Sequence, residues 1–318
     1  MRGEGATSAE ASARDYWALL KPRVMSLVIF TAFVGLVAAP GAPHPVIAFA
    51  AILCIAVGAG ASGALNMWWD ADIDRIMERT QKRPVPRGAV SAEDALGFGA
   101  ALGAVSVLFL GLFANLTAAA LLAGTILFYL VIYTIWLKRA TPLNIVIGGA
   151  AGAAPPMIGW AVATGGSLSL EPFVLFAIIF LWTPPHSWAL ALFRNDDYTR
   201  VGVPMLPVVA GEAETRRQIW LYSLGLTAAV LSLLATPIAG PAYWLASVIL
   251  SVMLLRNALR LLRRSTDQAQ ADKHLAEKKF FGFSILYLLL LFAALLADAG
   301  LAALGVAPEG LAALAAGL

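Results

Sequence analysis

The chain has 318 residues, of which 60% are hydrophobic and only 13% are charged, and its mean hydropathy is +0.80. This composition excludes an ordinary soluble domain, because such domains carry about 25% charged residues. The net charge of +3 does not indicate a nucleic-acid partner, since the 22 Lys and Arg residues are spread along the chain instead of being gathered in one basic module.

The chain begins with residues 1 to 20, which are small and polar and predict a flexible tail without the apolar core of a signal peptide. Stretches of about 20 apolar residues, the length that crosses a bilayer as a helix, then recur. They predict an all-α polytopic membrane protein with one domain, residues 21 to 305, and a C-terminal tail, residues 306 to 318. The nine expected spans are 24–39, 46–66, 93–113, 116–136, 143–163, 170–192, 217–236, 241–259 and 280–304.

All 22 Lys and Arg residues fall on one side of the membrane when the nine spans are threaded from a cytoplasmic N-terminus. They precede the first span or follow the second, fourth, sixth and eighth spans, whereas connections on the other side, such as 39–44, hold none. Because cytoplasmic flanks are rich in Lys and Arg, the pattern predicts a cytoplasmic N-terminus and a C-terminus on the far side. It indicates a bacterial cytoplasmic (inner) membrane and contact with a lipid bilayer containing anionic lipid.

Three oxygen-bearing side chains, Asn66, Asp70 and Asp74, end the second span at spacing i, i+4 and i+8. On a helix they share one face, and two carboxylates with an amide oxygen suit Mg²⁺ carrying phosphates. The cations that follow are Arg75, Arg79, Lys82, Arg83 and Arg87. Cations beside a metal site suit a diphosphate, whereas the alternative is a solvated loop with a few acids.

Two prolines, Pro184 and Pro185, precede His186 in the sixth span. They are expected to kink the helix or to begin a new segment, because proline lacks a backbone N–H. Asp197 lies eleven residues beyond His186, close to three helical turns, so both side chains are expected on one inward face. Asp196 or Asp197 is then expected to meet the first carboxylates across the bundle and complete a metal and diphosphate site.

These residues also have structural interpretations. His186 is alternatively an interior histidine that satisfies a carbonyl freed by the prolines, and Asp196 and Asp197 are alternatively N-cap or loop acids. An ionisable side chain within a membrane span is nevertheless a functional candidate.

One stretch resembles the first aspartate motif of the UbiA superfamily of intramembrane prenyltransferases: Asn66-x-x-x-Asp70-x-x-x-Asp74-x-x-x-x-Arg79-Thr80-x-x-Arg83-Pro84. Further stretches are similar to the branch of that superfamily that farnesylates haem: 20–24, 133–149, 154–160 and 182–186. The likeness extends from about Tyr16 to Phe283. One departure is that the second motif of the superfamily is usually another D-x-x-x-D, whereas Asp196 and Asp197 are adjacent here.

The resemblance implies a Mg²⁺-dependent prenyltransferase with a nine-helix bundle and a cavity facing the cytoplasm. It implies transfer of the farnesyl group of farnesyl diphosphate to a vinyl group of haem B, with addition of water, which gives haem O and diphosphate. Haem B is then a substrate and not a fixed cofactor. The candidate metal ligands are Asn66, Asp70, Asp74, Asp196 and Asp197. The candidate diphosphate ligands are Lys21, Arg23, Arg79, Lys82, Arg83, Lys138 and Arg139. The candidate catalytic residues are Asp70, Asp74, His186 and Asp197.

The role of His186 stays open between contact with the haem iron, contact with a propionate and orientation of Asp197. Aromatic residues near the motifs are candidates to stabilise a carbocation with their ring faces, and ordinary packing or an interfacial position is the alternative. These aromatic residues are Trp68, Trp69, Tyr133, Trp182 and Trp188.

Other functions fit part of the pattern. A related prenyltransferase would use another acceptor, such as an aromatic acid, a quinone precursor or a chlorin. A secondary transporter is a distant alternative, because its coupling charges cluster near mid-membrane, whereas the acids here lie beside cations at cytoplasmic helix ends. CDP-alcohol phosphotransferases require Asp-Gly-x-x-Ala-Arg, but Asp74 is followed by Arg75. A downstream haem-modifying or oxidase-assembly protein is a further candidate partner.

Overall fold

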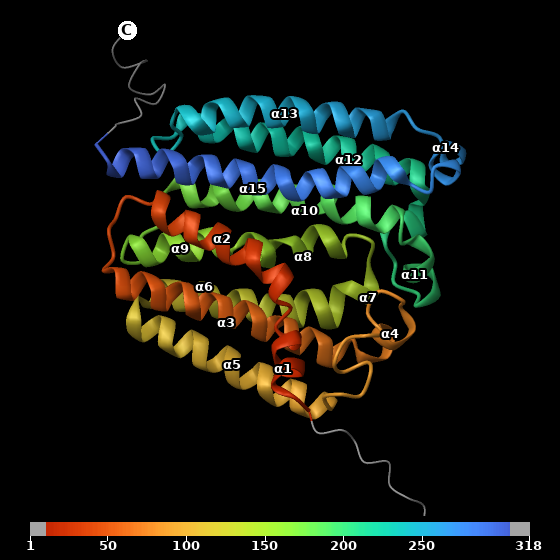
Figure 1. Cartoon of the computed structure of the whole chain (residues 1–318), viewed down its shortest axis with the longest axis horizontal. Coiled ribbons are helices and arrows are strands. Elements are labelled where there is room, and N and C mark those ends of the chain that lie inside the picture. Colours follow the sequence, from red (N-terminus) through yellow and green to blue (C-terminus); the bar gives the residue numbers. More distant parts are fainter. Residues whose placement is uncertain (1–10, 306–318) are drawn as a thin grey trace, which may run out of the picture.

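The structure is a computed structural model that describes residues 11 to 305. These residues form helices and no strand, which confirms the predicted all-α class. Eight helical segments in the described residues are long and apolar enough to cross a membrane, and they lie side by side along the long axis of the molecule (Figure 1). They are α3 (Pro45–Trp69), α5 (Ala92–Phe113), α6 to α7 (Leu116–Ala140), α8 and α9 (Asn144–Ala163), α10 (Leu170–Leu192), α12 and η2 (Leu206–Ala235), α13 (Pro241–Leu262) and α15 (Leu275–Ala303).

The first expected span corresponds to α2 (Pro22–Ala38), which is only 17 residues long and starts with a proline, a residue favoured at the first helical position. It forms a pair with α1 (Ala13–Leu19), bent by 53°, and the pair together passes as a ninth span. The predicted flexible tail is therefore wrong for Ala13–Leu19. The helix forms there because Ser12 and Asp15 make a capping box and Leu19 is fully buried.

Residues 1 to 10 and the predicted C-terminal tail, residues 306 to 318, lie outside the described residues.

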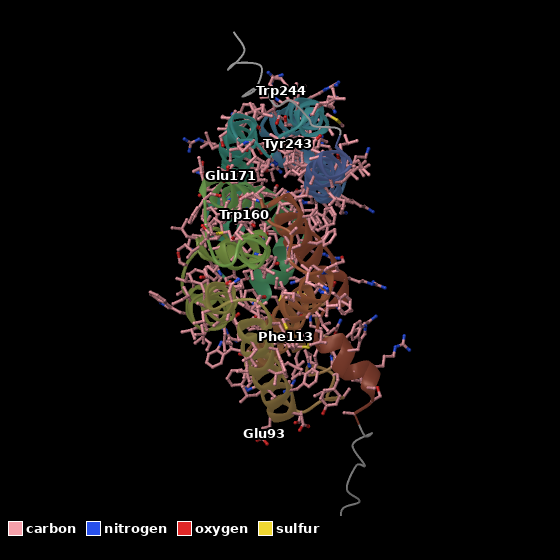
Figure 2. All side chains as sticks on the ribbon, turned by 90° about the vertical axis from the view of Figure 1, so that its left-hand side faces the viewer. Glu93, Phe113, Trp160, Glu171, Tyr243 and Trp244 are labelled. Carbon is pink, nitrogen blue, oxygen red and sulfur yellow. The ribbon has the colours of Figure 1, made fainter. Side chains whose placement is uncertain are left out.

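Two groups of helices, each with its own apolar core, make up the bundle (Figure 1). One group contains α10, α12, α13 and α15, and its core includes Tyr243, Tyr287 and Phe292. The other contains α2, α3, α6 and α9, with α5 packed on α3. Seen end-on, Trp160 of α9 lies near the middle of the bundle (Figure 2) and is 1% exposed.

Helices α2 and α9 approach very closely because each contributes a glycine to the contact. A Cβ atom on Gly35 would lie 2.2 Å from the carbonyl oxygen of Pro156, and one on Gly159 would lie 2.0 Å from that of Ala32. Only residues without a Cβ fit at this separation. This contact fixes α2 against the rest of the bundle and so positions one wall of the cavity described below.

The expected break in the sixth span is absent, because α10 runs from Leu170 to Leu192 with Pro184 and Pro185 inside it. Neighbouring groups hold the segment in place. Thr183 Oγ1 donates to the carbonyl oxygen of Ile179 at 2.9 Å, and Trp182 Nε1 donates to that of Ser284 on α15 at 2.7 Å. Membrane helices tolerate proline where side chains and adjacent helices compensate in this way.

The short helices lie together at one end of the bundle, on the right of Figure 1: α4 (Ala71–Ile76), α7 (Lys138–Ala140), α11 (Asn195–Arg200) and α14 (Thr266–Ala271). They belong to the connections in which the sequence concentrates Lys and Arg. Helix α12 begins at Leu206, earlier than the expected span, and bends at Gly211, whose φ is 81°. Its charged first turns therefore extend beyond the apolar part of the bundle.

Candidate active site

A cavity of about 340 Å³ lies between α2, α3, α6, η1 (Phe128–Leu137), α8 and α9. Its charged lining residues come from helix ends, short helices and the loop after α4: Lys21, Asp74, Arg79, Arg83 and Lys138. Its apolar lining residues come from the spans and include Val28, Ile55, Leu122, Ile126 and Ile158. The cavity therefore has a polar mouth and apolar walls.

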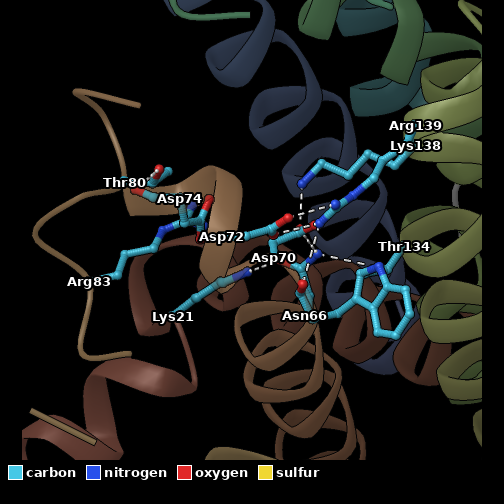
Figure 3. Close-up of polar contacts among 11 residues, drawn as sticks. Lys21, Asn66, Asp70, Asp72, Asp74, Thr80, Arg83, Thr134, Lys138 and Arg139 are labelled. Carbon is cyan, nitrogen blue, oxygen red and sulfur yellow. Dashed lines mark hydrogen bonds and ion pairs between the residues drawn. The ribbon is translucent and has the colours of Figure 1, made fainter. Parts of the chain in front are cut away.

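A hydrogen-bonded network at the mouth is centred on Asn66 (Figure 3). Asn66 Nδ2 donates to Asp70 Oδ2 at 2.6 Å and to Thr134 Oγ1 at 3.2 Å. Lys21 Nζ donates to Asn66 Oδ1 at 2.7 Å, and Lys138 Nζ is paired with Asp70 Oδ2. Asp70 is fully buried, so this carboxylate is held by one amide and one ammonium group.

The helix that carries these residues does not continue through Asp70, contrary to the simplest expectation. Helix α3 ends at Trp69, and Asp70 joins it to α4 with φ −86° and ψ 8°. The backbone bonds nevertheless continue in helical steps: the N–H of Asp70 donates to the carbonyl oxygen of Asn66 at 3.0 Å, and that of Asp74 donates to Asp70 at 2.8 Å. The three side chains therefore stay close to one face.

Asp74 is 1% exposed and lines the cavity. Arg83 Nη1 lies 2.6 Å from its Oδ2. Arg79 is exposed and also lines the cavity, whereas Lys82 is exposed and does not. Of these predicted diphosphate ligands, the structure brings Arg79 and Arg83 to the mouth and leaves Lys82 outside, because the chain turns after Met77 and the two arginines share the inward side of the loop.

Among the other predicted cations, Lys21 and Lys138 line the cavity and Arg23 does not. Arg139 points instead to Asp72, to which it donates two hydrogen bonds of 2.7 and 2.8 Å. These bonds lower the pKa of the Asp72 carboxyl group. The Arg139 guanidinium also lies 3.7 Å from Asp70 Oδ1, so it adds positive potential beside the mouth.

The π-helix η1 and the residue after it place four side chains toward the mouth. Tyr129, Tyr133 and Lys138, the first residue of α7, line the cavity, and Thr134 is fully buried against Asn66. Tyr129 and Thr134 are five residues apart, the i to i+5 spacing of a π-helix, which is often found at functional sites. The predictions missed Tyr129 and Thr134. Their polar or aromatic character at this spacing within an apolar run was the available signal.

The second motif meets the first across the bundle. Asp197 is 4% exposed, its Oδ1 accepts a hydrogen bond of 3.3 Å from the N–H of Glu78, and Arg200 Nη1 lies 3.7 Å away. Asp196 is exposed and does not line the cavity. Tyr198, which the predictions missed, lines the cavity. The two motifs therefore come together through Asp197 and not through Asp196.

His186 does not line the cavity. Its ring stacks between those of Trp182 and Phe281, with centroid distances of 4.3 and 4.5 Å, and its Nδ1 lies 2.7 Å from Ser284 Oγ. The expectation that His186 and Asp197 share one helix face is wrong, because α10 ends at Leu192 and Asp197 belongs to α11.

The candidate aromatic residues also differ in whether they line the cavity. Tyr133 lines the cavity, whereas the four tryptophans do not. Trp188 is 2% exposed and packs edge-on against Tyr222 at 5.2 Å. Trp182 is held against α15 by its hydrogen bond to Ser284.

Of the three buried carboxylates, Asp74 lines the cavity and Asp70 and Asp197 do not. Carboxylates beside lining cations suit a divalent metal ion bound together with a phosphorylated substrate. Asp70 Oδ1 and Asp197 Oδ2 are buried and have no hydrogen-bond partner among the described residues. Within residues 11 to 305, no three His, Cys, Asp or Glu side chains are close enough to enclose a metal ion. Mg²⁺ does not need such a cage, since it is usually held by one or two carboxylates, waters and the substrate phosphates.

Comparison with known structures shows the same fold. The chain superimposes on a digeranylgeranylglyceryl phosphate synthase with a TM-score of 0.72, 17% identity and coverage of 90% of this chain and 98% of the other. It also superimposes on a UbiA homologue from Archaeoglobus fulgidus bound to DMAPP and Mg²⁺, with a TM-score of 0.62, 15% identity and coverage of 86% and 99%.

Sequence comparison gives much closer relatives. The model of the UbiA prenyltransferase family matches residues 27–285. The protoheme IX farnesyltransferase of Azorhizobium caulinodans is 61% identical over 92% of this chain and 94% of its own length, and that of Parvibaculum lavamentivorans is 62% identical over 90% and 89%. The chain therefore belongs to the UbiA prenyltransferase family and, within it, to the protoheme IX farnesyltransferases.

Proposed function

We propose that this membrane prenyltransferase transfers the farnesyl group of farnesyl diphosphate to a vinyl group of haem B, with addition of water, to give haem O and diphosphate. The observation that carries the proposal is the cavity itself. Its mouth combines the buried carboxylate of Asp74 with four lining cations, Lys21, Arg79, Arg83 and Lys138, and its walls are apolar. A prenyl diphosphate has the same division into an anionic head and an apolar chain.

The cations at the mouth are the proposed ligands of the diphosphate. In the structure Arg83 and Lys138 are paired with Asp74 and Asp70, and both cations line the cavity. A diphosphate at the mouth offers these cations stronger, charge-assisted hydrogen bonds. We infer that they turn from the carboxylates to the diphosphate when the substrate binds, which leaves the carboxylate oxygens free.

Asp70, Asp74 and Asp197 are the proposed carboxylates of the Mg²⁺ site, and each of them is buried. Since no three such groups in residues 11 to 305 are close enough to enclose one ion, one or two of these carboxylates would hold Mg²⁺ together with waters and the substrate phosphates. When bound, Mg²⁺ supplies Lewis-acid stabilisation of the charge on the departing diphosphate. Asn66 is assigned a positioning role, because its amide oxygen already accepts from Lys21 and its amide nitrogen holds Asp70. A UbiA homologue of the same fold bound to DMAPP and Mg²⁺ supports Mg²⁺ as the ion that accompanies the prenyl diphosphate.

The chain's own residues favour ionisation of the allylic C–O bond and protect the farnesyl cation. Cations at the mouth stabilise the leaving diphosphate, and the apolar walls keep water from the cation. The ring faces of Tyr129 and Tyr133, whose centroids are 5.3 Å apart, are positioned to attract it. The terminal vinyl carbon of haem then bonds to the farnesyl carbon. Water adds its oxygen to the vinyl carbon next to the porphyrin ring and releases a proton.

We also propose that the end of the bundle with the cavity mouth faces the cytoplasm of a bacterial inner membrane, with the C-terminus on the far side. The supporting pattern is the restriction of Lys and Arg to one set of connections. Farnesyl diphosphate would then enter from the cytoplasmic leaflet.

Transfer of a labelled farnesyl group tests the proposal. The purified chain in detergent is incubated with radiolabelled farnesyl diphosphate, Mg²⁺ and one acceptor at a time: haem B, an aromatic acid, a quinone precursor or a chlorin. The label is expected to move to haem B. Transfer to another acceptor, with haem B left unlabelled, would contradict the proposed substrate and favour a different branch of the same chemistry.

A further inference from the structure

The imidazole of His186 is held rigidly in a position that the cavity does not explain. Both of its faces are covered, by Trp182 at 4.3 Å and by Phe281 at 4.5 Å, with interplanar angles of 16° and 24°. One ring nitrogen, Nδ1, contacts Ser284 Oγ at 2.7 Å. Stacking on both faces and one hydrogen bond together fix the orientation of the ring.

The contacts of Ser284 favour one tautomer. Ser284 Oγ lies 2.7 Å from the carbonyl oxygen of Phe281, to which it can donate its one proton. A hydroxyl group that donates to this carbonyl accepts from His186, and this arrangement places the imidazole proton on Nδ1. The other nitrogen, Nε2, then carries a lone pair. A histidine that donates from one nitrogen to a fixed acceptor and offers the other as a lone pair has the arrangement of a metal ligand.

The lone pair of Nε2 is available. Nε2 makes no hydrogen bond to residues 11 to 305. The atom is nevertheless not fully buried, and His186 as a whole is half-buried. By contrast, a structural histidine in a membrane bundle is expected to use both nitrogens, because an unused polar atom in an apolar environment is unfavourable.

His186 also lies at the depth of the cavity mouth. Helices α8 and α10 touch at Gly149 and Thr183, where a Cβ atom on Gly149 would lie 3.0 Å from Thr183 Cβ. The two helices are antiparallel, so one turn from this contact toward the short helices leads to Ile145 on α8 and to His186 on α10. Ile145 lines the cavity. A planar molecule held at His186 would therefore lie at the same depth in the bundle as the polar end of the cavity.

We propose that His186 Nε2 binds the iron of haem B at the depth of the cavity mouth. This inference rests on the proposed function and adds the acceptor site to it. His186 donates its lone pair to the iron, Ser284 is a positioning residue that holds the tautomer, and Trp182 and Phe281 keep the ring from rotating. The iron stays unchanged in the reaction, so its only role is to anchor the macrocycle.

Absorbance titration of the purified full chain with ferric haem B, in the absence of farnesyl diphosphate, tests the inference. The wild type is expected to give the spectrum of a nitrogen-ligated haem. His186→Ala should lose that spectrum, and added imidazole should restore it by filling the vacated position. Ser284→Ala should weaken haem binding about tenfold, as loss of a partner of a ligating histidine does. Iron-free protoporphyrin IX should bind the wild type and His186→Ala equally well.

The matched control is His44→Ala, because His44 is exposed at the start of α3, at the other end of the bundle, and its loss should leave the spectrum unchanged. Binding of farnesyl diphosphate by His186→Ala shows that this variant is folded. If the wild type farnesylates haem and His186→Ala keeps the haem spectrum and affinity of the wild type, the role of His186 is contradicted and the proposed function is not. A wild type that leaves haem B unfarnesylated would instead contradict the proposed function.

Discussion

Arg83 Nη1 lies 2.6 Å from Asp74 Oδ2 at the mouth of the cavity. Asp74 is 1% exposed, and both residues line the cavity. Lys138 and Asp70 form a second pair of the same kind. Asp70 and Asp74 are thus each neutralised by a cation that also lines the cavity, and removal of either cation would leave an uncompensated buried charge.

Asp70→Asn is expected to lower the rate of farnesyl transfer by about 100-fold or more, the scale of losing one preorganised electrostatic group in an active site. The variant should remain folded, since asparagine keeps the shape of the side chain. Product formation and the melting temperature in detergent measure both effects. Asp72→Asn is the matched control, because Asp72 is exposed two residues away and pairs with Arg139 outside the cavity. Equal activity of Asp70→Asn and wild type would remove Asp70 from the site.

Arg83→Gln is expected to raise the KM for farnesyl diphosphate by about 10- to 100-fold, because a hydrogen bond to a charged group is worth about 1.5–3 kcal/mol. Lys82→Gln removes a positive charge one residue away, outside the cavity, and should change KM little. Steady-state kinetics of the two variants separate a specific contact from general attraction by a basic loop. Similar changes in both variants would favour the general attraction.

Tyr133 tests whether a ring face stabilises the farnesyl cation. Tyr133→Leu should lower kcat by roughly thirtyfold, since a desolvated cation–π contact is worth about 2 kcal/mol. Tyr133→Phe keeps the ring and should retain most of the activity. The comparison of the two kcat values is the measurement. If Tyr133→Phe were as impaired as Tyr133→Leu, the hydroxyl group and not the ring face would be responsible.

Gly152 lines the cavity, and a Cβ atom there would meet nothing within 4 Å. Gly152→Leu should therefore fold but fill part of the space, and substrate binding should weaken by at least the cost of one poorly accommodated side chain, about 1–3 kcal/mol. Gly124→Leu is the control, because Gly124 is equally free of neighbours but does not line the cavity. If Gly152→Leu bound both substrates with wild-type affinity, neither substrate would lie against α8 at this position.

Hydropathy and charge predicted the membrane helices well, because each span needs a continuous apolar run and the membrane imposes that requirement locally. The first motif was also accessible, since Asn66, Asp70 and Asp74 are neighbours along one backbone segment and their proximity needs only helical geometry.

The relation between distant residues was harder to predict. Whether His186 faces Asp197 or Ser284 depends on where α10 ends and how α15 packs, and neither property is encoded within the local sequence. The π-helical register that brings Tyr129 and Thr134 toward Asn66 is likewise a result of packing, because the same apolar run reads as an ordinary helix. The loop cations show the same limit: Arg79 and Arg83 line the cavity and Lys82 does not, a difference set by the turn after Met77.

The most direct measurement is the mass spectrum of the haem recovered after incubating the purified protein with haem B, farnesyl diphosphate and Mg²⁺, with and without EDTA. The proposed reaction predicts a haem that has gained one farnesyl group and one hydroxyl group, and only when Mg²⁺ is available. Unmodified haem from folded protein, or the same product in EDTA, would contradict the account of a metal-dependent haem farnesyl transfer.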